Sequence, residues 1–213
     1  MVPRPADYPD YITFTGYWTM PDSDDFQPSA ELADFLGLGT GDRAHDESKI
    51  NDPPVYMGFG SMPLRDIGAT AQAFSRVLKR LNKRGILCVG WSDREALTQA
   101  GPLGDHVLVI DGAPHEWLLP RCAMAIHHGG AGTTAATLRA GIPCIIFSVL
   151  IDQPFWAYRC ALLGVGPENT RTIIELSEQT LEEQIVAASN PQVLYLFSLS
   201  LSLSLSLSLS LSL

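Results

Sequence analysis

Residues 123–140 read Ala-Met-Ala-Ile-His-His-Gly-Gly-Ala-Gly-Thr-Thr-Ala-Ala-Thr-Leu-Arg-Ala. The apolar run at the start, from Ala123 to Ile126, is typical of a buried strand, and the stretch from Gly132 to Ala140 is typical of a helix. The glycines between them let the backbone turn sharply and approach a ligand closely. The segment therefore predicts a strand, a glycine-rich turn and a helix.

The same alternation continues on both sides of this segment. The predicted strands are residues 55–59, 85–90, 107–110, 123–126 and 143–147, and the predicted helices are residues 65–81, 93–100, 114–119, 132–140, 153–162 and 177–188. Continuous apolar strands that alternate with helices indicate a parallel sheet covered on both faces. We therefore expect an α/β domain over residues 55–193, with a Rossmann-like doubly wound parallel sheet.

The two ends of the chain differ from this block. Residues 1–54 are rich in Pro, Asp and Gly and are expected to be an entry linker, with one short strand over residues 11–17 and a short helix capped by Ser29. Residues 194–213 are a low-complexity tail in which Ser and Leu alternate. We interpret the tail as a translated repeat rather than a structural element.

Composition and charge exclude several classes of function. The net charge is −9, but the block from Val55 to Cys160 holds ten Lys/Arg and seven Asp/Glu, so it carries +3 and the flanks carry −12. Nucleic acid is therefore a poor partner, whereas a small anionic ligand suits the block. No apolar run is long enough to cross a bilayer. Four scattered cysteines fit reduced core thiols. We expect a cytoplasmic protein with at most peripheral membrane contact.

The predicted strand ends carry the chemistry, because ligands of doubly wound sheets bind outside the carboxyl ends of the strands. Gly129, Gly130 and Gly132 lead into a helix N-terminus, which offers unpaired N–H groups and a partial positive charge. His128, Thr133 and Thr134 add side-chain donors. This arrangement predicts a pyrophosphate site. The sequence has no P-loop, and no acidic residue ends the next strand to take a ribose, which argues against NAD.

Residues 8 to about 191 resemble the C-terminal, nucleotide-sugar-binding domain of sterol and related UDP-glycosyltransferases of the GT-B type. Four stretches carry the resemblance: residues 15–18 (Thr-Gly-Tyr-Trp), residues 55–62 (Val-Tyr-Met-Gly-Phe-Gly-Ser-Met), Gly90-Trp91, and the long block 113–156. That block runs from Ala-Pro-His to Asp-Gln-Pro-Phe-Trp.

The resemblance implies a role for each matching position. His128 would contact the pyrophosphate, and Gly130, Gly132, Thr133 and Thr134 would surround the phosphates, which Ser61 would also reach. Ala113 to His115 would border the uracil through the backbone, and Trp91 would flank the base. Asp152 and Gln153 would hold sugar hydroxyls. No metal and no cofactor are expected, since the UDP-sugar is the donor substrate.

The resemblance implies a transferase that moves a hexose, with glucose favoured, from a UDP-sugar to a hydroxyl of a sterol or other lipid. Fixed N–H dipoles and His128 would stabilise the departing diphosphate. The general base that glycosyl transfer needs, and the acceptor pocket, lie on the N-terminal domain in this family. We expect no catalytic base on this chain. A polyketide or glycolipid acceptor, a non-catalytic UDP-sugar-binding fragment and, less favoured, a UDP-sugar epimerase remain alternatives.

Other residues have simpler interpretations. His127, His128 and Cys122 lack further ligands at metal spacing, which disfavours zinc. Asp22-Ser-Asp24 matches a D-x-D metal motif, but it lies in an acidic loop with no strand before it. Trp117 and Trp156 are expected to pack in the core. The basic residues at the end of helix 65–81 are expected to be solvated: Lys79, Arg80, Lys83 and Arg84.

Overall fold

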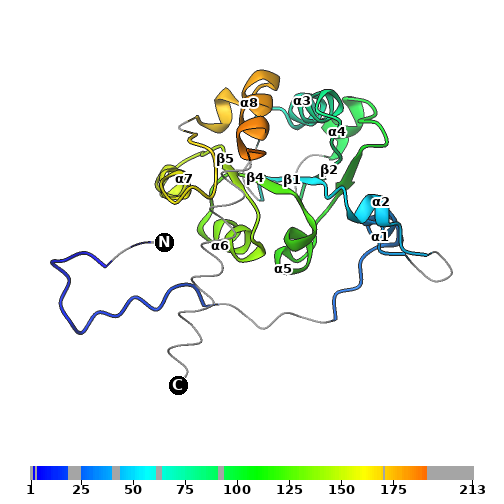
Figure 1. The fold of residues 1–213 in the computed structure, drawn as a ribbon. Helices are drawn as coiled ribbons and strands as arrows, with labels where there is room; N and C mark the ends of the chain where they lie inside the picture. Colours follow the sequence, from blue (N-terminus) through cyan, green and yellow to red (C-terminus); the bar gives the residue numbers. More distant parts are fainter. Residues whose placement is uncertain are drawn as a thin grey trace.

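The structure, a computed structural model, describes residue 2 and residues 4–18, 25–39, 44–60, 64–90, 94–169 and 171–190. Five parallel strands form one sheet in the order β3-β2-β1-β4-β5 (Figure 1). The strands are β1 (Val55–Gly58), β2 (Gly85–Cys88), β3 (Val107–Ile110), β4 (Met124–His127) and β5 (Cys144–Ile146). The order reverses between β1 and β4, as in a doubly wound sheet, so the predicted fold class is confirmed.

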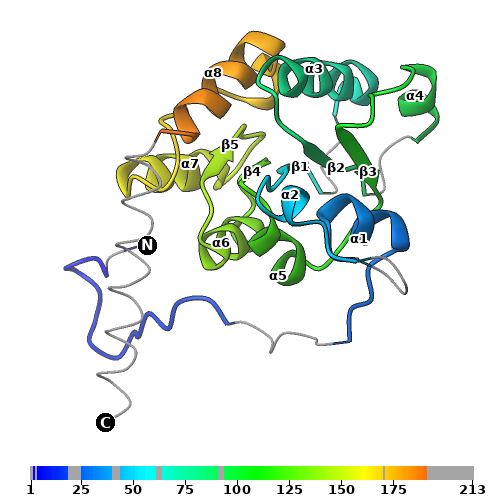
Figure 2. The same cartoon turned by 45° about the vertical axis from the view of Figure 1, so that its right-hand side comes forward.

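The helices cover both faces of the sheet. One face carries α3 (Ile67–Arg80), α4 (Arg94–Gln99) and α8 (Glu178–Ala188). The other carries α1 (Ala30–Leu36), α2 (Glu47–Ile50), α5 (His115–Leu118) and α6 (Ala131–Ala140), and α7 (Gln153–Leu162) lies beside β5 (Figures 1 and 2). Two 3-10 turns, η1 (Leu119–Arg121) and η2 (Ile173–Glu175), complete the described elements.

Each face has its own hydrophobic core, because successive side chains of a strand point to opposite sides. In β1, Val55 and Met57 pack with Phe74 of α3 and Leu181 of α8. Tyr56 points the other way and packs with a second cluster that includes residues of α1 and α5. Both faces of β1 are therefore dry, which explains its continuous apolar sequence.

Local signals fix where helices begin. The Ser29 hydroxyl accepts the N–H of Leu32 at 3.2 Å at the start of α1, as the sequence predicted. Ser177 caps α8 in the same way through the N–H of Thr180. Asp66 caps α3 by accepting the N–H of Ala69 at 2.8 Å. The helix boundaries follow these caps to within a residue or two of their expected positions.

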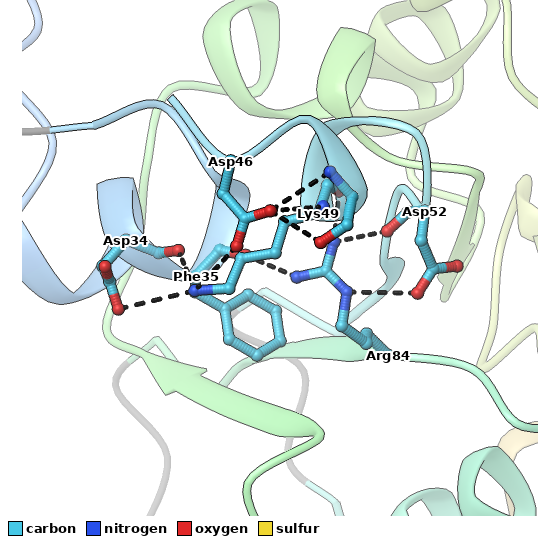
Figure 3. Close-up of polar contacts among 7 residues, drawn as sticks. Asp34, Phe35, Asp46, Lys49, Asp52 and Arg84 are labelled. Carbon is cyan, nitrogen blue, oxygen red and sulfur yellow. Dashed lines mark hydrogen bonds and ion pairs between the residues drawn. The ribbon is translucent and has the colours of Figure 1, made fainter. Parts of the chain in front are cut away.

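The segment with α1 and α2 differs from the linker that composition predicts for residues 1–54. Leu32 and Leu36 are buried in the core beneath the sheet. Figure 3 shows why the segment stays there: the guanidinium of Arg84 donates to the backbone carbonyls of Phe35, Lys49 and Asp52. The same guanidinium lies 5.0 Å from the centre of the Phe35 ring. Arg84, expected to be solvated, instead ties the segment to the start of β2.

Residues 4–18 form no strand, in contrast to the one expected over residues 11–17. Tyr11 and Trp18 are exposed there, and Gly16 has φ +75°, which interrupts an extended run.

The Ser-Leu tail lies outside the described residues. All four cysteines are free thiols, and Cys122, Cys144 and Cys160 are buried. Among the residues that the structure describes, no helix combines the length and apolar character needed to cross a membrane.

Candidate functional site

The loops that follow β1, β3, β4 and β5 meet at one edge, because parallel strands share the direction of their carboxyl ends. The described residues of this edge include nine of the eleven predicted site residues: Ala113, His115, His128, Gly130, Gly132, Thr133, Thr134, Asp152 and Gln153. Ser61 and Trp91 lie outside the described residues.

The turn between β4 and α6 is built from glycine. Gly129 has φ +90°, and a Cβ on it would lie 2.6 Å from Cγ2 of Ile146. Gly130 occupies the N-cap position of α6, so no side chain caps the helix. The first N–H groups of a helix have no partner inside it, and a helix start of this kind is suited to binding an anion. A Cβ on Gly132 would meet no atom within 4 Å, so this helix start faces open space.

His128 lies against this turn and is half-buried. A Cβ on Gly130 would come within 2.5 Å of Nε2 of His128, and a Cβ on Gly60 would lie 3.5 Å from Cε1. Burial lowers the pKa of His128; the nearby His115 lowers it further and Asp152 opposes the change. The imidazole is therefore neutral near pH 7. Its buried Nδ1 has no hydrogen-bond partner among the described residues, which is costly unless a partner is supplied.

The two threonines of α6 differ in what they offer. Thr134 is fully buried, and its hydroxyl donates to the carbonyl of Gly130 at 2.9 Å. The hydroxyl proton of Thr134 is therefore used within α6, whereas the family resemblance implies that Thr134 contacts the phosphates. Thr133 is half-buried one position earlier, and its role there stays a prediction.

Gln153 holds the loop between β5 and α7. Its Oε1 accepts the N–H of Val149 at 2.7 Å and that of Leu150 at 3.1 Å. Two backbone donors fix the orientation of this buried amide, so its NH2 is the group left to donate. Ile151, in the same loop, has φ +59°, an unfavourable angle for a β-branched residue. Such strain persists only where surrounding contacts hold it, and functional sites are where it concentrates.

Asp152 is exposed beside Gln153. Its Oδ2 accepts the indole N–H of Trp156 at 2.7 Å. Trp156, expected in the core, is half-buried and holds this carboxylate, and its ring lies 6.2 Å from that of Tyr17. This bond engages Oδ2 and leaves Oδ1 of the exposed carboxylate to accept from a hydroxyl donor.

The segment from Ala113 to His115 follows β3. Nε2 of His115 lies 3.1 Å from the hydroxyl of Tyr56, and the two rings meet edge to face. Burial lowers the pKa of His115, so the ring is neutral. Because the imidazole is turned into the domain, the backbone is what this segment presents at the edge of the sheet.

Two described glycines lead into the loops of Ser61 and Trp91. Gly60 has φ +61° and Gly90 has φ +54°. A Cβ on Gly90 would lie 3.4 Å from the carbonyl oxygen of Gly60, so the two loops start side by side next to His128.

Metal ligands do not gather in the part of the chain that the structure describes, where no three His, Cys, Asp or Glu side chains form a group. Asp22 and Asp24 lie outside that part.

Trp117 packs against Phe26, with ring centres 5.0 Å apart, and under the guanidinium of Arg121. The loop-holding role of Gln153 was missed by the sequence analysis, because it depends on backbone donors that no pattern of side chains reveals.

Comparison with known proteins places this edge in a family. The profile of the family described as erythromycin biosynthesis protein CIII-like, C-terminal domain, matches residues 78–194, more than half of the chain. The chain belongs to this family. The CIII-like match covers the described loops after β3, β4 and β5, and it confirms the resemblance that residues 113–156 carry.

Curated relatives of this CIII-like chain include sterol 3-beta-glucosyltransferases. One from Arabidopsis thaliana is 36% identical over 185 residues, which are 87% of this chain and 26% of the relative. One from Aspergillus clavatus is 42% identical over 171 residues, 78% of this chain and 12% of the relative. The chain therefore spans about a quarter or less of the length of these relatives.

Solved structures agree with the fold. The glycosyltransferase VinC in complex with DTDP is 26% identical, with a TM-score of 0.56 over 68% of this chain and 36% of VinC. The glycotransferase of kitacinnamycin has a TM-score of 0.60 at 23% identity, over 77% of this chain and 43% of that one. These are GT-B glycosyltransferases, and the match covers less than half of each.

Proposed function

We propose that this chain is the donor-binding half of a glycosyltransferase that moves a hexose, with glucose favoured, from a UDP-sugar to a hydroxyl of a sterol or other lipid. The observation that carries the proposal is the uncapped start of α6, with His128 beside it and open space in front of Gly132. The names of the curated relatives support the lipid acceptor, and the DTDP bound to VinC supports a nucleoside diphosphate.

The proposed division of labour follows from the geometry. The N–H groups at the start of α6 point their dipoles at the diphosphate and stabilise the negative charge that grows as it leaves. His128 adds one N–H donor, since a neutral imidazole carries a proton on one nitrogen. Asp152 accepts, and the Gln153 amide donates, hydrogen bonds with sugar hydroxyls. The backbone of Ala113 to His115 borders the base.

The remaining chemistry belongs to the acceptor. A base must take the proton of the attacking hydroxyl. We assign that base, and the lipid pocket, to an acceptor-binding domain such as the longer relatives have room for. Donor binding without a metal or another cofactor is part of the proposal, because the N–H groups at the start of α6 and the neutral imidazole of His128 supply hydrogen-bond donors to the phosphates. Four free thiols favour a reducing compartment such as the cytoplasm.

Calorimetric titration of UDP and UDP-glucose into the chain tests the proposal. We expect micromolar to millimolar binding that EDTA leaves unchanged and that His128→Ala weakens about tenfold, the effect of one hydrogen bond to a charged group. The matched control is His45→Ala, which removes an exposed histidine between α1 and α2. Absence of binding by the folded chain, or equal effects of the two variants, contradicts the assignment. Strict dependence on a metal contradicts its metal-free part.

A further inference from the structure

His127, the last residue of β4, is fully buried and adjoins the turn without facing the open edge. Its Nδ1 accepts the backbone N–H of Gly129 at 3.0 Å. A backbone N–H can only donate, so Nδ1 carries no proton and the neutral ring is protonated on Nε2. That Nε2 lies 3.1 Å from Sγ of Cys144. The two contacts therefore define one tautomer.

The contacts continue from His127 towards α7. Cys144, in β5, packs in one buried cluster with Cys160 of α7. Interaction with Cys160, together with burial, raises the pKa of Cys144, so its thiol stays protonated. Hydrogen bonds thus join three groups in sequence, the Gly129 amide, the imidazole of His127 and the thiol of Cys144, and the last of them packs against Cys160. These contacts link the phosphate turn to the helix that begins with Gln153.

The same turn is in direct contact with that helix. A Cβ on Gly129 would lie 3.2 Å from both Cβ and the carbonyl oxygen of Gln153, and 2.6 Å from Cγ2 of Ile146. A small displacement of Gly129 is therefore transmitted to the sugar-binding pair as well as to the start of α6. Neither packing contact, however, fixes the direction of the Gly129 peptide, and the hydrogen bond to His127 does.

We infer that His127 is a positioning residue of the donor site: its Nδ1 holds the Gly129 peptide so that the following N–H groups at the start of α6 meet the diphosphate. This inference rests on the proposed function for the identity of the ligand. Its basis in the chain itself, the contact between His127 and Gly129, is independent of that function.

The chemistry of the imidazole suits this role. Burial, followed by the neighbouring His128 and His115, lowers the pKa of His127 to about 3. The ring remains neutral wherever the protein is folded near neutral pH, and Nδ1 keeps its lone pair. A protonated ring would lose the acceptor and release Gly129.

Two amide substitutions separate the two ends of the ring. In His127→Asn the side-chain oxygen sits where Nδ1 was and still accepts from Gly129. In His127→Gln the longer side chain reaches Cys144 and leaves Gly129 without its acceptor. Each variant leaves one buried amide group without a hydrogen-bond partner, so the two variants are expected to lose similar amounts of thermal stability. We expect the Gln variant to bind UDP about tenfold more weakly than the Asn variant.

Uridine and amide exchange complete the test. Uridine lacks the phosphates, so its affinity should be the same for both variants, whereas a general loosening of the fold would weaken both ligands. Hydrogen exchange at Gly129, measured by NMR without ligand, should stay slow in the Asn variant and become faster in the Gln variant. In the wild type, imidazole NMR should find the His127 proton on Nε2.

The outcomes separate the inference from the proposed function. If the wild type fails to bind UDP, the proposed function falls, while Gly129 exchange and the tautomer still decide the positioning role. Equal UDP affinities of the two variants, equal losses for uridine, or a proton on Nδ1 would overturn the inference. If neither variant folds, Cys144→Ala serves in their place: it removes the acceptor of Nε2–H and should speed Gly129 exchange, which Cys144→Ser should leave slow.

Discussion

A side chain at Gly130 and the imidazole of His128 compete for the same space: a Cβ at residue 130 would lie 2.5 Å from Nε2 of His128. The glycine therefore serves the histidine beside it rather than the backbone angles of the turn, since Gly130 has φ −58°, which any residue adopts.

Gly130→Ala should displace His128 and weaken UDP binding by about tenfold or more, since it costs the diphosphate at least one hydrogen bond. Thermal unfolding should change little, because the backbone angles are allowed and the imidazole can rotate outward. Gly132→Ala is the matched control for stability: its Cβ meets no atom within 4 Å, and alanine favours a helix by about 1 kcal/mol over glycine. Undiminished UDP affinity of Gly130→Ala would refute the proposed role of His128.

Gln153 should divide into a structural and a binding function. Gln153→Leu leaves the N–H groups of Val149 and Leu150 without their acceptor, which should cost about 1–3 kcal/mol of stability. Gln153→Glu keeps an acceptor but loses the NH2 donor. It should unfold near the wild-type temperature and bind UDP normally, yet bind UDP-glucose no better than UDP. Calorimetry with both ligands checks this, and an equal loss for UDP would place Gln153 at the diphosphate instead.

Stability should fall as the pH drops below 6.5, because the pKa values of His115, His127 and His128 are all lowered by burial. Each ring is neutral when folded and takes up a proton on unfolding, so the unfolded state binds more protons below its pKa of 6.5. The loss from His127 continues towards pH 3, where the folded state also becomes protonated. For one such histidine, the free energy of unfolding falls by about 1.4 kcal/mol per pH unit.

Denaturant unfolding of the wild type and of His127→Asn between pH 6.5 and 5 measures this contribution. The variant should lose less stability per pH unit by about 1.4 kcal/mol. Four surface carboxylates have lowered pKa values: Asp46, Glu175, Glu178 and Glu183. All of them titrate at or below 4.5, so they leave this window clear. Identical slopes for the two proteins would show that His127 is not buried as a neutral ring.

Arg84→Met should loosen the segment with α1 and α2. It removes the donor that three backbone carbonyls share, which should cost about 2 kcal/mol or more, and it should admit protease between residues 30 and 54. UDP affinity should be preserved, because Arg84 precedes β2 and the site lies at the other end of the strands. Arg80→Met, which breaks exposed ion pairs with Glu178 and Glu182, should have a smaller effect. Equal protease resistance in both variants would contradict the anchoring of this segment by Arg84.

The sequence predicts the sheet well because strands of a buried parallel sheet are continuous apolar runs. Val55 to Gly58 and Val107 to Ile110 are continuous apolar runs, and Ser29 and Ser177 mark helix starts by their own hydroxyls. The location of the site follows from the same runs, since loops after parallel strands share an edge.

Contacts with backbone groups are what the sequence could not show. Arg84 reaches carbonyls up to 49 positions away, so a segment rich in Pro and Asp looks like a linker although it is anchored. The hydroxyl of Thr134 turns back to the carbonyl of Gly130 instead of facing a ligand. The strand expected over residues 11–17 has suitable residues but gains no ladder partner.

NMR mapping of UDP on the 15N-labelled chain shows whether a nucleoside diphosphate binds at the start of α6. We expect UDP to shift the amide signals of residues 129–133, Ala113 and His115 and to leave those of α8 unchanged. Shifts confined to other surfaces, or no shifts at millimolar UDP, would contradict binding at the start of α6.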